Sequence, residues 1–412
     1  MTIQDPRTYL RSLFMAAVQA ADPMVTLPKY LPPRPSGRLI IIGAGKASAR
    51  MAEVVEGHYG PCEGLVITRY GYERPTQGIE IASASHPIPD QAGMDATRRI
   101  VDLASDLNAD DLVIALISGG GSSLLCAPVE GVSLADKMEI TAQLLACGAP
   151  IGEINTVRKT LSLVKGGRLA AACAPAQVVS LLISDVPGDD PSLIASGPTV
   201  ASHTGAQEAK EILERRGVDI TPHVMAAIER FDHPIEMSAR NEMHMIAAPS
   251  QSLNAAAALA GDVDVRILGD AIEGEARDLA QEHAQMAMDI QRNGLDRPLL
   301  ILSGGECTVT RRGAGTGGPN AEYVLAAALA LNGARGIHVL ACDTDGVDGA
   351  AEVAGAYAGP ETSAQARAAG LDMRNELDSN NAHGFFAAVD SQILTGPTLT
   401  NVNDFRAMLI TP

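Results

Sequence analysis

The chain has 412 residues and a formal charge of −18 at pH 7, and aromatic residues make up only 3% of it. Binding to nucleic acid or to an anionic membrane surface needs clustered Lys and Arg, so this charge argues against both kinds of partner. The length predicts two domains, whose cores must be filled by aliphatic residues and alanine. No apolar run approaches the roughly 18 residues of a membrane-spanning helix, so we expect no membrane span.

The start of the chain and its cysteines both indicate a cytoplasmic protein. The residues after Pro6 carry charge early and follow an amphipathic helical pattern, which differs from the apolar core of a signal peptide. The six cysteines are scattered and include no CxxC pair, a usage that is typical of reduced thiols in the cytosol.

Apolar runs alternate with helical patterns through the first half of the chain. We expect strands at 38–42, 64–68, 112–117 and 178–184, with helices at 47–56, 90–106 and 133–147. Continuous apolar runs indicate strands that are covered on both faces, as in a parallel sheet with helices on each side. This pattern predicts an α/β fold with a Rossmann-like, doubly wound sheet.

The segment 231–234 interrupts the periodicity, so we place a domain boundary there and predict domains at 1–233 and 234–412. The second domain is expected to be α/β with a mixed sheet. Its predicted strands lie at 242–247, 263–268, 299–302, 308–310 and 337–341, and its predicted helix lies at 320–330.

The first glycine turn, at 43–48, follows an expected strand and opens an expected helix. It is close to a dinucleotide fingerprint, but Ser48 stands where the third glycine belongs and no acidic residue follows some 20 positions on. Arg69 would suit a ribose 2′-phosphate, so NADPH binding stays an alternative. Lys46 lies inside the turn, where it could neutralise a phosphate or a carboxylate, and Gly43 and Gly45 would let the ligand approach.

Two further segments combine glycine with hydroxyl residues, and each follows an apolar run. A turn without side chains exposes backbone N–H groups to phosphate oxygens, so a pair of such segments indicates an enzyme that handles phosphoryl groups. The spacing is not that of a Walker loop. The expected ligand contacts are Ser118, Gly119, Gly120, Gly121, Ser122 and Ser123 in the first glycine segment, and Ser303, Gly304, Gly305 and Glu306 in the second.

Charged residues cluster at two more places. Arg158 belongs to a basic group that continues through 165–168, in a chain where cations are scarce. Asp185 and Asp189 follow an expected strand, at the sheet end where ligands of α/β folds gather. Either aspartate could hold Mg²⁺ or accept a hydroxyl proton.

The second half has acidic and polar loops of its own. The segment 343–349 reads DTDGVDG, and its spacing fails that of an EF-hand calcium loop. The segment 395–404 is rich in hydrogen-bonding groups. Further expected ligand contacts are Asn320, Asp345 and Thr398.

These motifs, in this order, resemble those of the class II glycerate 2-kinases, whose N-terminal Rossmann-like domain is joined to a C-terminal domain named MOFRL. Two segments, 315–322 and 380–383, differ from the family's usual GRGGRNQE and NDSY. The resemblance covers nearly the whole chain through GAGKAS at 43–48, SGGGSSLL at 118–125, RKTLSLVKGGRLA at 158–170, SDVPGDDPSLIASGPT at 184–199, GEAR at 274–277, SGGECTVT at 303–310, TDGVDG at 344–349 and TGPTLTNVND at 395–404.

The resemblance implies a cytoplasmic kinase that uses ATP and Mg²⁺ to phosphorylate the 2-hydroxyl of D-glycerate, in a cleft between the two domains. Lys46 would neutralise phosphoryl charge or hold the acceptor's carboxylate, assisted by Arg158 or Arg277, and Asp185 or Asp189 would bind the metal. The alternatives are an NAD(P)H-dependent hydroxypyruvate reductase, a kinase for a longer hydroxy acid, and a non-catalytic binder of sugar acids. A homodimer is compatible with the sequence, which does not determine the number of subunits.

Overall fold

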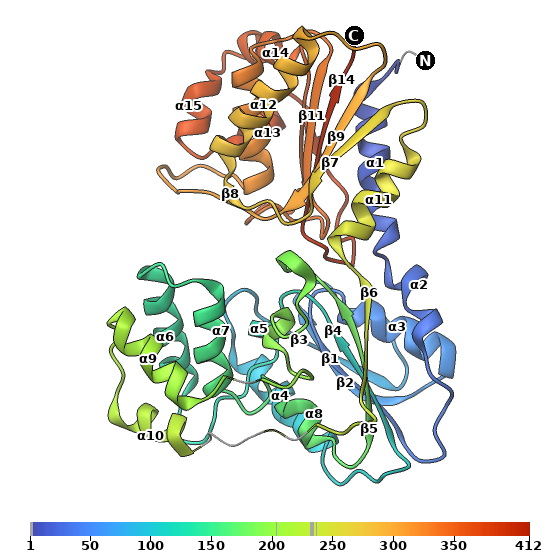
Figure 1. Ribbon diagram of the computed structural model, residues 1–412, viewed down its shortest axis with the longest axis vertical. Helices are drawn as coiled ribbons and strands as arrows, with labels where there is room; N and C mark the ends of the chain where they lie inside the picture. Colours follow the sequence, from blue (N-terminus) through green and yellow to red (C-terminus); the bar gives the residue numbers. More distant parts are fainter. Residues whose placement is uncertain (1–2, 203, 231–234, 236) are drawn as a thin grey trace. The chain divides into compact units, whose positions relative to one another are not determined.

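The computed structural model describes residues 3–202, 204–230, 235 and 237–412, which form two compact units (Figure 1). The N-terminal unit comprises residues 26–184 and 189–246, and the C-terminal unit comprises the chain up to Val25, residues 185–188 and residues 247–412. The expected domain boundary at 231–234 lies outside the described residues. None of the described helices is long and apolar enough to cross a membrane.

The N-terminal unit is built on a six-stranded sheet with the order β3-β2-β1-β4-β5-β6. The pairs from β3 through β5 are parallel, as the sequence predicted. Every residue of the central strands β1 and β4 is buried, which explains their continuous apolar sequence. The strands are β1 (Leu39–Ala44), β2 (Glu63–Arg69), β3 (Ile79–Ala84), β4 (Leu112–Ile117), β5 (Gln177–Ile183) and β6 (Glu242–Ala247).

The helices of this unit include a separate bundle, in which α6, α7, α9 and α10 gather to one side and share an aliphatic core (Figure 1). The helices are α3 (Ser48–Tyr59), α4 (Gln91–Leu103), α5 (Gly121–Leu124), α6 (Leu134–Ala146), α7 (Ile151–Thr160), α8 (Arg168–Ala172), α9 (Ala206–Arg216) and α10 (Pro222–Arg230), with 3₁₀ turns η1 (Pro28–Tyr30) and η3 (Ile194–Ser196). Two of the three residues of a further turn, η2 (Pro187–Asp189), belong to the C-terminal unit.

The C-terminal unit has a mixed sheet with the order β13-β12-β11-β14-β9-β7, in which β7 and β9 are parallel and the other neighbours are antiparallel. A short parallel pair, β8 and β10, lies beside it. The strands are β7 (Asp264–Gly269), β8 (Gly274–Glu275), β9 (Leu299–Gly305), β10 (Cys307–Thr308), β11 (Ile337–Asp343), β12 (Gly355–Ala358), β13 (Gln392–Ile393) and β14 (Asp404–Ile410).

Helices cover both faces of this mixed sheet (Figure 1). On one face α1 packs on α11, and Asp5 caps the start of α1 by accepting a hydrogen bond from the Thr8 backbone N–H. An alanine-rich core joins α12 and α13 to the other face. The helices are α1 (Pro6–Ala20), α2 (Pro23–Thr26), α11 (Pro249–Leu259), α12 (Ala276–Arg292), α13 (Pro319–Leu331), α14 (Thr362–Ala368), α15 (Met373–Asp378) and α16 (Ala382–Ala388).

The structure differs from the sequence-based expectation at several elements, among them the following. The strand at 242–247 was expected in the second domain, but β6 is the edge strand of the first sheet. The first helix belongs to the C-terminal unit, because the buried side chains of Leu10, Leu13 and Phe14 join that unit's core. The buried central strand β14 was not expected at all.

Candidate functional site

The glycine turn and the first glycine segment meet at the carboxyl ends of β1 and β4, which are neighbours in the sheet. The Lys46 backbone N–H donates to the Gly119 carbonyl at 2.8 Å, and the Ala47 N–H donates to Ser118 Oγ at 3.0 Å. Gly45 has a φ of +146°, and a Cβ there would lie 2.1 Å from Ser118 Oγ. Only glycine therefore allows the two connections to approach this closely.

Gly120 shows which side chains border the first glycine segment. A Cβ added to it would lie 2.9 Å from Cδ2 of His86 and 3.3 Å from Cγ of Lys46. The structure thus places Lys46 beside the first glycine segment, while its expected role toward a phosphate or a carboxylate stays a prediction. His86 was not among the expected site residues, because an isolated histidine gives no sequence signal.

Hydroxyl groups on the other side of this segment form a chain of hydrogen bonds. Ser122 Oγ and Ser196 Oγ are 2.8 Å apart, and Ser196 Oγ donates to Asn155 Oδ1 at 3.1 Å. Ala195 and Ser196 have φ values of +52° and +63°, a left-handed conformation that costs energy for residues with a Cβ. Lys165 Nζ stabilises this arrangement by donating to the Ser122 carbonyl at 2.9 Å and the Ala195 carbonyl at 3.3 Å.

Three basic side chains, Lys137, Arg158 and Lys165, lie close enough to interact electrostatically, and we call them the cation cluster. Lys165 joins this cluster to the hydrogen-bonded hydroxyl groups through its bond to the Ser122 carbonyl. Burial lowers the pKa of all three, and the charges of Lys137 and Arg158 help to hold the pKa of Lys165 well below its ordinary value. No aspartate or glutamate of the described residues forms an ion pair with any of them. Among the described residues, the hydrogen-bond partner of Lys137 Nζ is the Cys126 Sγ, at 3.7 Å.

The two expected metal ligands have different surroundings. Asp185 Oδ2 accepts a hydrogen bond from Asn401 Nδ2 at 3.2 Å, and its carbonyl accepts one from Asn403 Nδ2 at 3.1 Å. Asp189 has a φ of +55°, and its buried Oδ1 has no hydrogen-bond partner in the described part of the chain. An unpaired buried carboxylate oxygen fits a cation ligand.

The described residues include no group of three or more His, Cys, Asp or Glu side chains arranged to hold a metal. Mg²⁺ is usually held by only one or two carboxylates, with water and phosphate oxygens completing its shell. The donor set around Asp189 therefore remains compatible with magnesium.

The second glycine segment is not a loop as expected, because Ser303–Gly305 completes the strand β9. Arg406 of the neighbouring strand β14 faces it, and this arginine was not predicted. Its guanidinium donates to Ser303 Oγ at 3.3 Å, to the Ile272 carbonyl at 3.2 Å and to the Gly304 carbonyl. Arg406 is only 2% exposed, so these contacts fix the segment from inside the unit.

Carboxylates surround this arginine and the start of α13. Asp348 accepts from the backbone N–H groups of Asn320 and Ala321, at 2.9 and 2.8 Å, so the helix N-terminus is already occupied by a carboxylate. Asn320 Nδ2 donates to Asp404 Oδ1 at 2.6 Å, and Arg406 Nη1 lies 3.3 Å from Asp404 Oδ2. Burial, outweighing the arginine, raises the pKa of Asp404 to about 7.

His383 adds an imidazole to this carboxylate group. Its Nε2 lies 2.9 Å from Asp348 Oδ2, but at an angle that does not form a hydrogen bond. Among the described residues, neither ring nitrogen of His383 has a hydrogen-bond partner. Asp404, Arg406 and His383 were not among the site residues expected from the sequence.

The remaining expected site residues of the C-terminal unit lie in internal contacts. Arg277 is buried and donates to Glu322 through Nη2 at 2.8 Å, with Asp378 at 3.4 Å, an arrangement that joins α12 to α13 and α15. Asp345 is fully buried, and its carboxylate accepts from the Val347 N–H at 2.8 Å. The Thr398 N–H donates to the Asp345 carbonyl at 3.2 Å.

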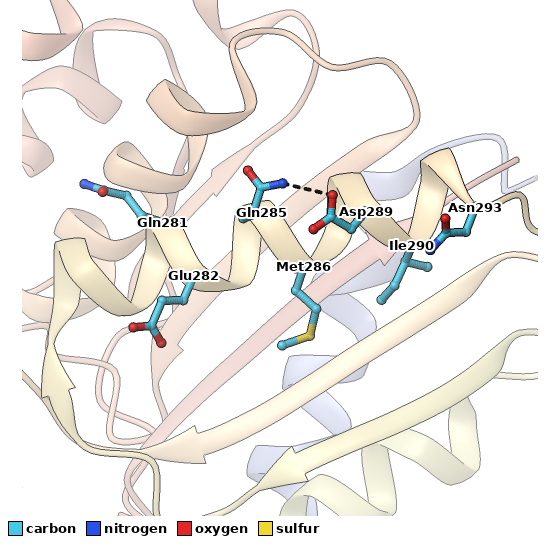
Figure 2. Close-up of a pocket in the computed structure, with 7 residues that line it drawn as sticks. All are labelled: Gln281, Glu282, Gln285, Met286, Asp289, Ile290 and Asn293. Atoms are coloured by element: carbon cyan, nitrogen blue, oxygen red, sulfur yellow. Dashed lines mark hydrogen bonds between the residues drawn. The ribbon is translucent and has the colours of Figure 1, made fainter.

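A surface groove of about 750 Å³ runs along α12, as Figure 2 shows. Six of its lining side chains come from α12 and the seventh, Asn293, follows the end of that helix; Gln285 donates to Asp289 one turn along it at 2.9 Å. None of the expected site residues lines it. The lining residues are Gln281, Glu282, Gln285, Met286, Asp289, Ile290 and Asn293.

Comparison with known proteins gives two family matches and several relatives along the whole chain. Residues 9–229 match a domain of unknown function, DUF4147, and residues 299–404 match the MOFRL family. The chain is 37% identical to a D-glycerate 2-kinase of Thermotoga maritima, over 96% of each protein. It is 47% identical to an Agrobacterium vitis protein with the provisional name hydroxypyruvate reductase, over 98% of this chain and 94% of that protein.

Solved structures agree with the sequence comparison. A crystal structure of glycerate kinase from Thermotoga maritima matches with a TM-score of 0.89 at 36% identity, covering 98% of this chain and 99% of that one. A Pyrococcus horikoshii protein matches with a TM-score of 0.82 at 33% identity, over the full length of both chains.

Proposed function

Because the chain belongs to the class II glycerate 2-kinase family, we propose that it phosphorylates D-glycerate at the 2-hydroxyl, with ATP as the donor. In this reaction the bond between the γ-phosphorus and the bridging oxygen of ADP breaks. A new bond joins that phosphorus to the 2-oxygen, and the hydroxyl proton is released. The observation that carries the proposal is the full-length match to a D-glycerate 2-kinase of the same fold.

Phosphoryl transfer needs positioned reactants and neutralised charge rather than covalent chemistry by the protein. Cγ of Lys46 lies 3.3 Å from where a Cβ on Gly120 would stand. This closeness to the first glycine segment supports a role for Lys46 in neutralising a phosphoryl group. Main-chain N–H groups of the first glycine segment would add hydrogen bonds to the ligands. That the reaction takes place in a cleft between the two domains stays a prediction.

Mg²⁺, when bound, would neutralise charge on the phosphate oxygens of ATP. The unpaired Oδ1 of Asp189 supports this residue as a ligand of the metal. Asp185 would act beside it, oriented by its hydrogen bonds with Asn401 and Asn403. Either carboxylate could instead orient the acceptor hydroxyl.

A reductase acting on hydroxypyruvate is the second candidate, since some relatives carry that name. The local geometry argues against it. In a dinucleotide fold the pyrophosphate binds the N–H groups at the first helix. Here the N–H groups of Lys46, Ala47 and Ser48 already donate to Gly119, Ser118 and Gly45.

One pair of assays tests the proposal against this alternative. The purified chain is given D-glycerate with ATP and Mg²⁺, and separately hydroxypyruvate with NADPH. We expect ADP formation that depends on D-glycerate and no oxidation of NADPH. Oxidation of NADPH without ADP formation would overturn the proposal.

A further inference from the structure

The side chains of the cation cluster lie largely in the interior of the N-terminal unit. Lys165 is fully buried and Lys137 is only 6% exposed, while Arg158 is half-buried. They come from three places in the chain, namely α6, α7 and the segment before α8. The fold therefore assembles positive charge in the interior of a chain whose formal charge is −18.

These cations have far more hydrogen-bond donors than partners. A lysine ammonium carries three donors and an arginine guanidinium five. Within the described part of the chain, Lys165 uses two of its donors on the carbonyls of Ser122 and Ala195, and the hydrogen-bond partner of Lys137 Nζ is the Cys126 thiol. The Arg158 guanidinium forms no hydrogen bond or ion pair with any residue that the structure describes.

Such an arrangement is costly unless an anion completes it. Burying a charge without a counter-charge costs free energy, which is why the pKa values of the cluster are lowered. A bound anion would reverse this cost, because opposite charges interact strongly where water is excluded. The cluster is thus built to bind an anion that the chain itself does not supply.

Neighbouring groups indicate the kind of anion. Asn155 and Arg158 are three residues apart on α7, so they share one face of that helix. Asn155 belongs to the hydrogen-bonded hydroxyl chain of Ser122 and Ser196, which would place hydroxyl partners beside the guanidinium. A planar guanidinium binds a carboxylate through two parallel hydrogen bonds. The combination matches a small acid that carries hydroxyl groups next to its carboxylate.

Lys46 and the cation cluster contact different residues of the first glycine segment. Lys46 approaches the segment at Gly120, whereas Lys165 binds the carbonyl of Ser122. Two different anions could therefore be held along one segment. Transfer between ATP and a hydroxy acid needs two such sites, one for phosphoryl oxygens and one for the acceptor's carboxylate.

We propose that Lys137, Arg158 and Lys165 form the subsite for the carboxylate of the hydroxy-acid acceptor, with Arg158 as its direct ligand and Lys165 as a positioning residue. This inference rests on the proposed kinase function and names the part of the site that selects acids. Neutral polyols of the same length, such as glycerol, lack the carboxylate, so we expect the subsite not to bind them. The substrate class is that of short 2-hydroxy acids.

The KM values of Arg158→Gln for D-glycerate and for ATP show which of the two anions the cluster binds. The loss of a charge-assisted contact should raise KM for D-glycerate about 10- to 100-fold and leave KM for ATP within about threefold. Lys137→Met should raise KM for D-glycerate about tenfold, and Arg158→Lys should restore part of the loss. Arg98→Gln, which removes an exposed cation of α4, is the matched control and should behave as wild type.

Thermal stabilisation supplies a readout that does not depend on turnover. D-glycerate alone should raise the melting temperature of wild type and Arg98→Gln but not of Arg158→Gln, and ATP with Mg²⁺ should stabilise all three. If Arg158→Gln does not fold, Lys137→Met takes its place with a reduced shift expected. Glycerol at the same concentration should give no shift that depends on Arg158.

Other outcomes would overturn the proposal that the cation cluster binds the acceptor's carboxylate. A rise in KM for ATP with an unchanged KM for D-glycerate would assign the cluster to nucleotide phosphates. A fall in kcat alone, or wild-type stabilisation that persists in Arg158→Gln, would reduce the cluster to a structural role. A wild type that D-glycerate stabilises through Arg158 but that forms no ADP would refute the kinase proposal and leave the subsite standing.

Discussion

The two glycine segments have nearly the same composition but opposite surroundings. Ser118–Ser123 lies among basic side chains, and the nearby cation cluster has no carboxylate partner among the described residues. Ser303–Glu306 is fixed by one arginine that is itself next to Asp404, and its carbonyls are the groups in use. The first segment is suited to an anion, whereas the second is suited to a cation or a hydroxyl group. Composition alone does not distinguish them, because the neighbours that set the charge come from distant parts of the chain.

The first prediction concerns Arg406, which should have the largest effect on stability. Arg406→Met would remove the charge next to buried Asp404 and a hydrogen bond to each of the carbonyls of Gly304 and Ile272. We expect the free energy of unfolding of the C-terminal unit to fall by about 3–5 kcal/mol. Denaturant unfolding measures this, with the exposed Arg292→Gln as the control, which should change it by less than about 0.5 kcal/mol. Equal effects of the two variants would show that Arg406 does not fix the second segment.

The second prediction tests the cationic character of the first segment. Lys46→Ala should lower kcat/KM about 100- to 1,000-fold while the chain folds normally, because a positioned charge is lost from the transition state. Steady-state kinetics and circular dichroism give the two quantities. Near-wild-type kinetics would exclude Lys46 from the reaction.

The third prediction is that the free energy of unfolding depends on pH through Asp404, which lies next to Arg406 beside the second glycine segment. The pKa of Asp404 is raised to about 7 from an ordinary value of 3.8, so the folded chain keeps a proton that the unfolded chain releases above pH 4. The free energy of unfolding should therefore fall as the pH rises through this window. Asp404→Asn cannot lose that proton. Its stability relative to wild type should increase by about 2–4 kcal/mol between pH 4 and pH 8.

Unfolding curves of wild type and Asp404→Asn at several pH values measure that difference. Asp390→Asn, at another acidic position of the same unit, serves as the control. A stability difference that does not change with pH would show that Asp404 titrates as an ordinary carboxyl group.

The fourth prediction concerns the shape of the first segment and has the smallest expected effect. Gly120 has a φ of +79°, and an added Cβ would meet the His86 ring. Gly120→Ala should cost about 1–2 kcal/mol of stability. Gly131→Ala, at a φ of +88° with open space around it, isolates the backbone cost from the contact with His86. Equal costs would mean that His86 does not border the segment.

Much of the fold follows from local sequence pattern. The buried strands β1, β4 and β5 are continuous apolar runs, and the structure confirms each of them within two residues. The placement of β6 could not be read in this way, because it depends on pairing with a strand more than 60 residues earlier. The strand β14 begins in a polar segment, which concealed it.

The candidate site also has residues that the sequence indicates and residues that only the fold brings together. Glycine and hydroxyl runs are visible in sequence because their backbone requirements are local. Arg406 acts on Ser303 across 103 positions and Lys165 acts on Ser122 across 43, so their partners emerge only from the fold. Lys137 gave no signal, since a single lysine in an amphipathic helix resembles any surface cation.

The position of the new phosphate group tests the central claim most directly. The chain is incubated with D-glycerate, ATP and Mg²⁺ in the presence of enolase, pyruvate kinase and lactate dehydrogenase, without phosphoglycerate mutase. Enolase accepts 2-phosphoglycerate, so we predict immediate oxidation of NADH that depends on D-glycerate. Oxidation that begins only when the mutase is added would show transfer to the 3-hydroxyl, and no oxidation under either condition would contradict the kinase.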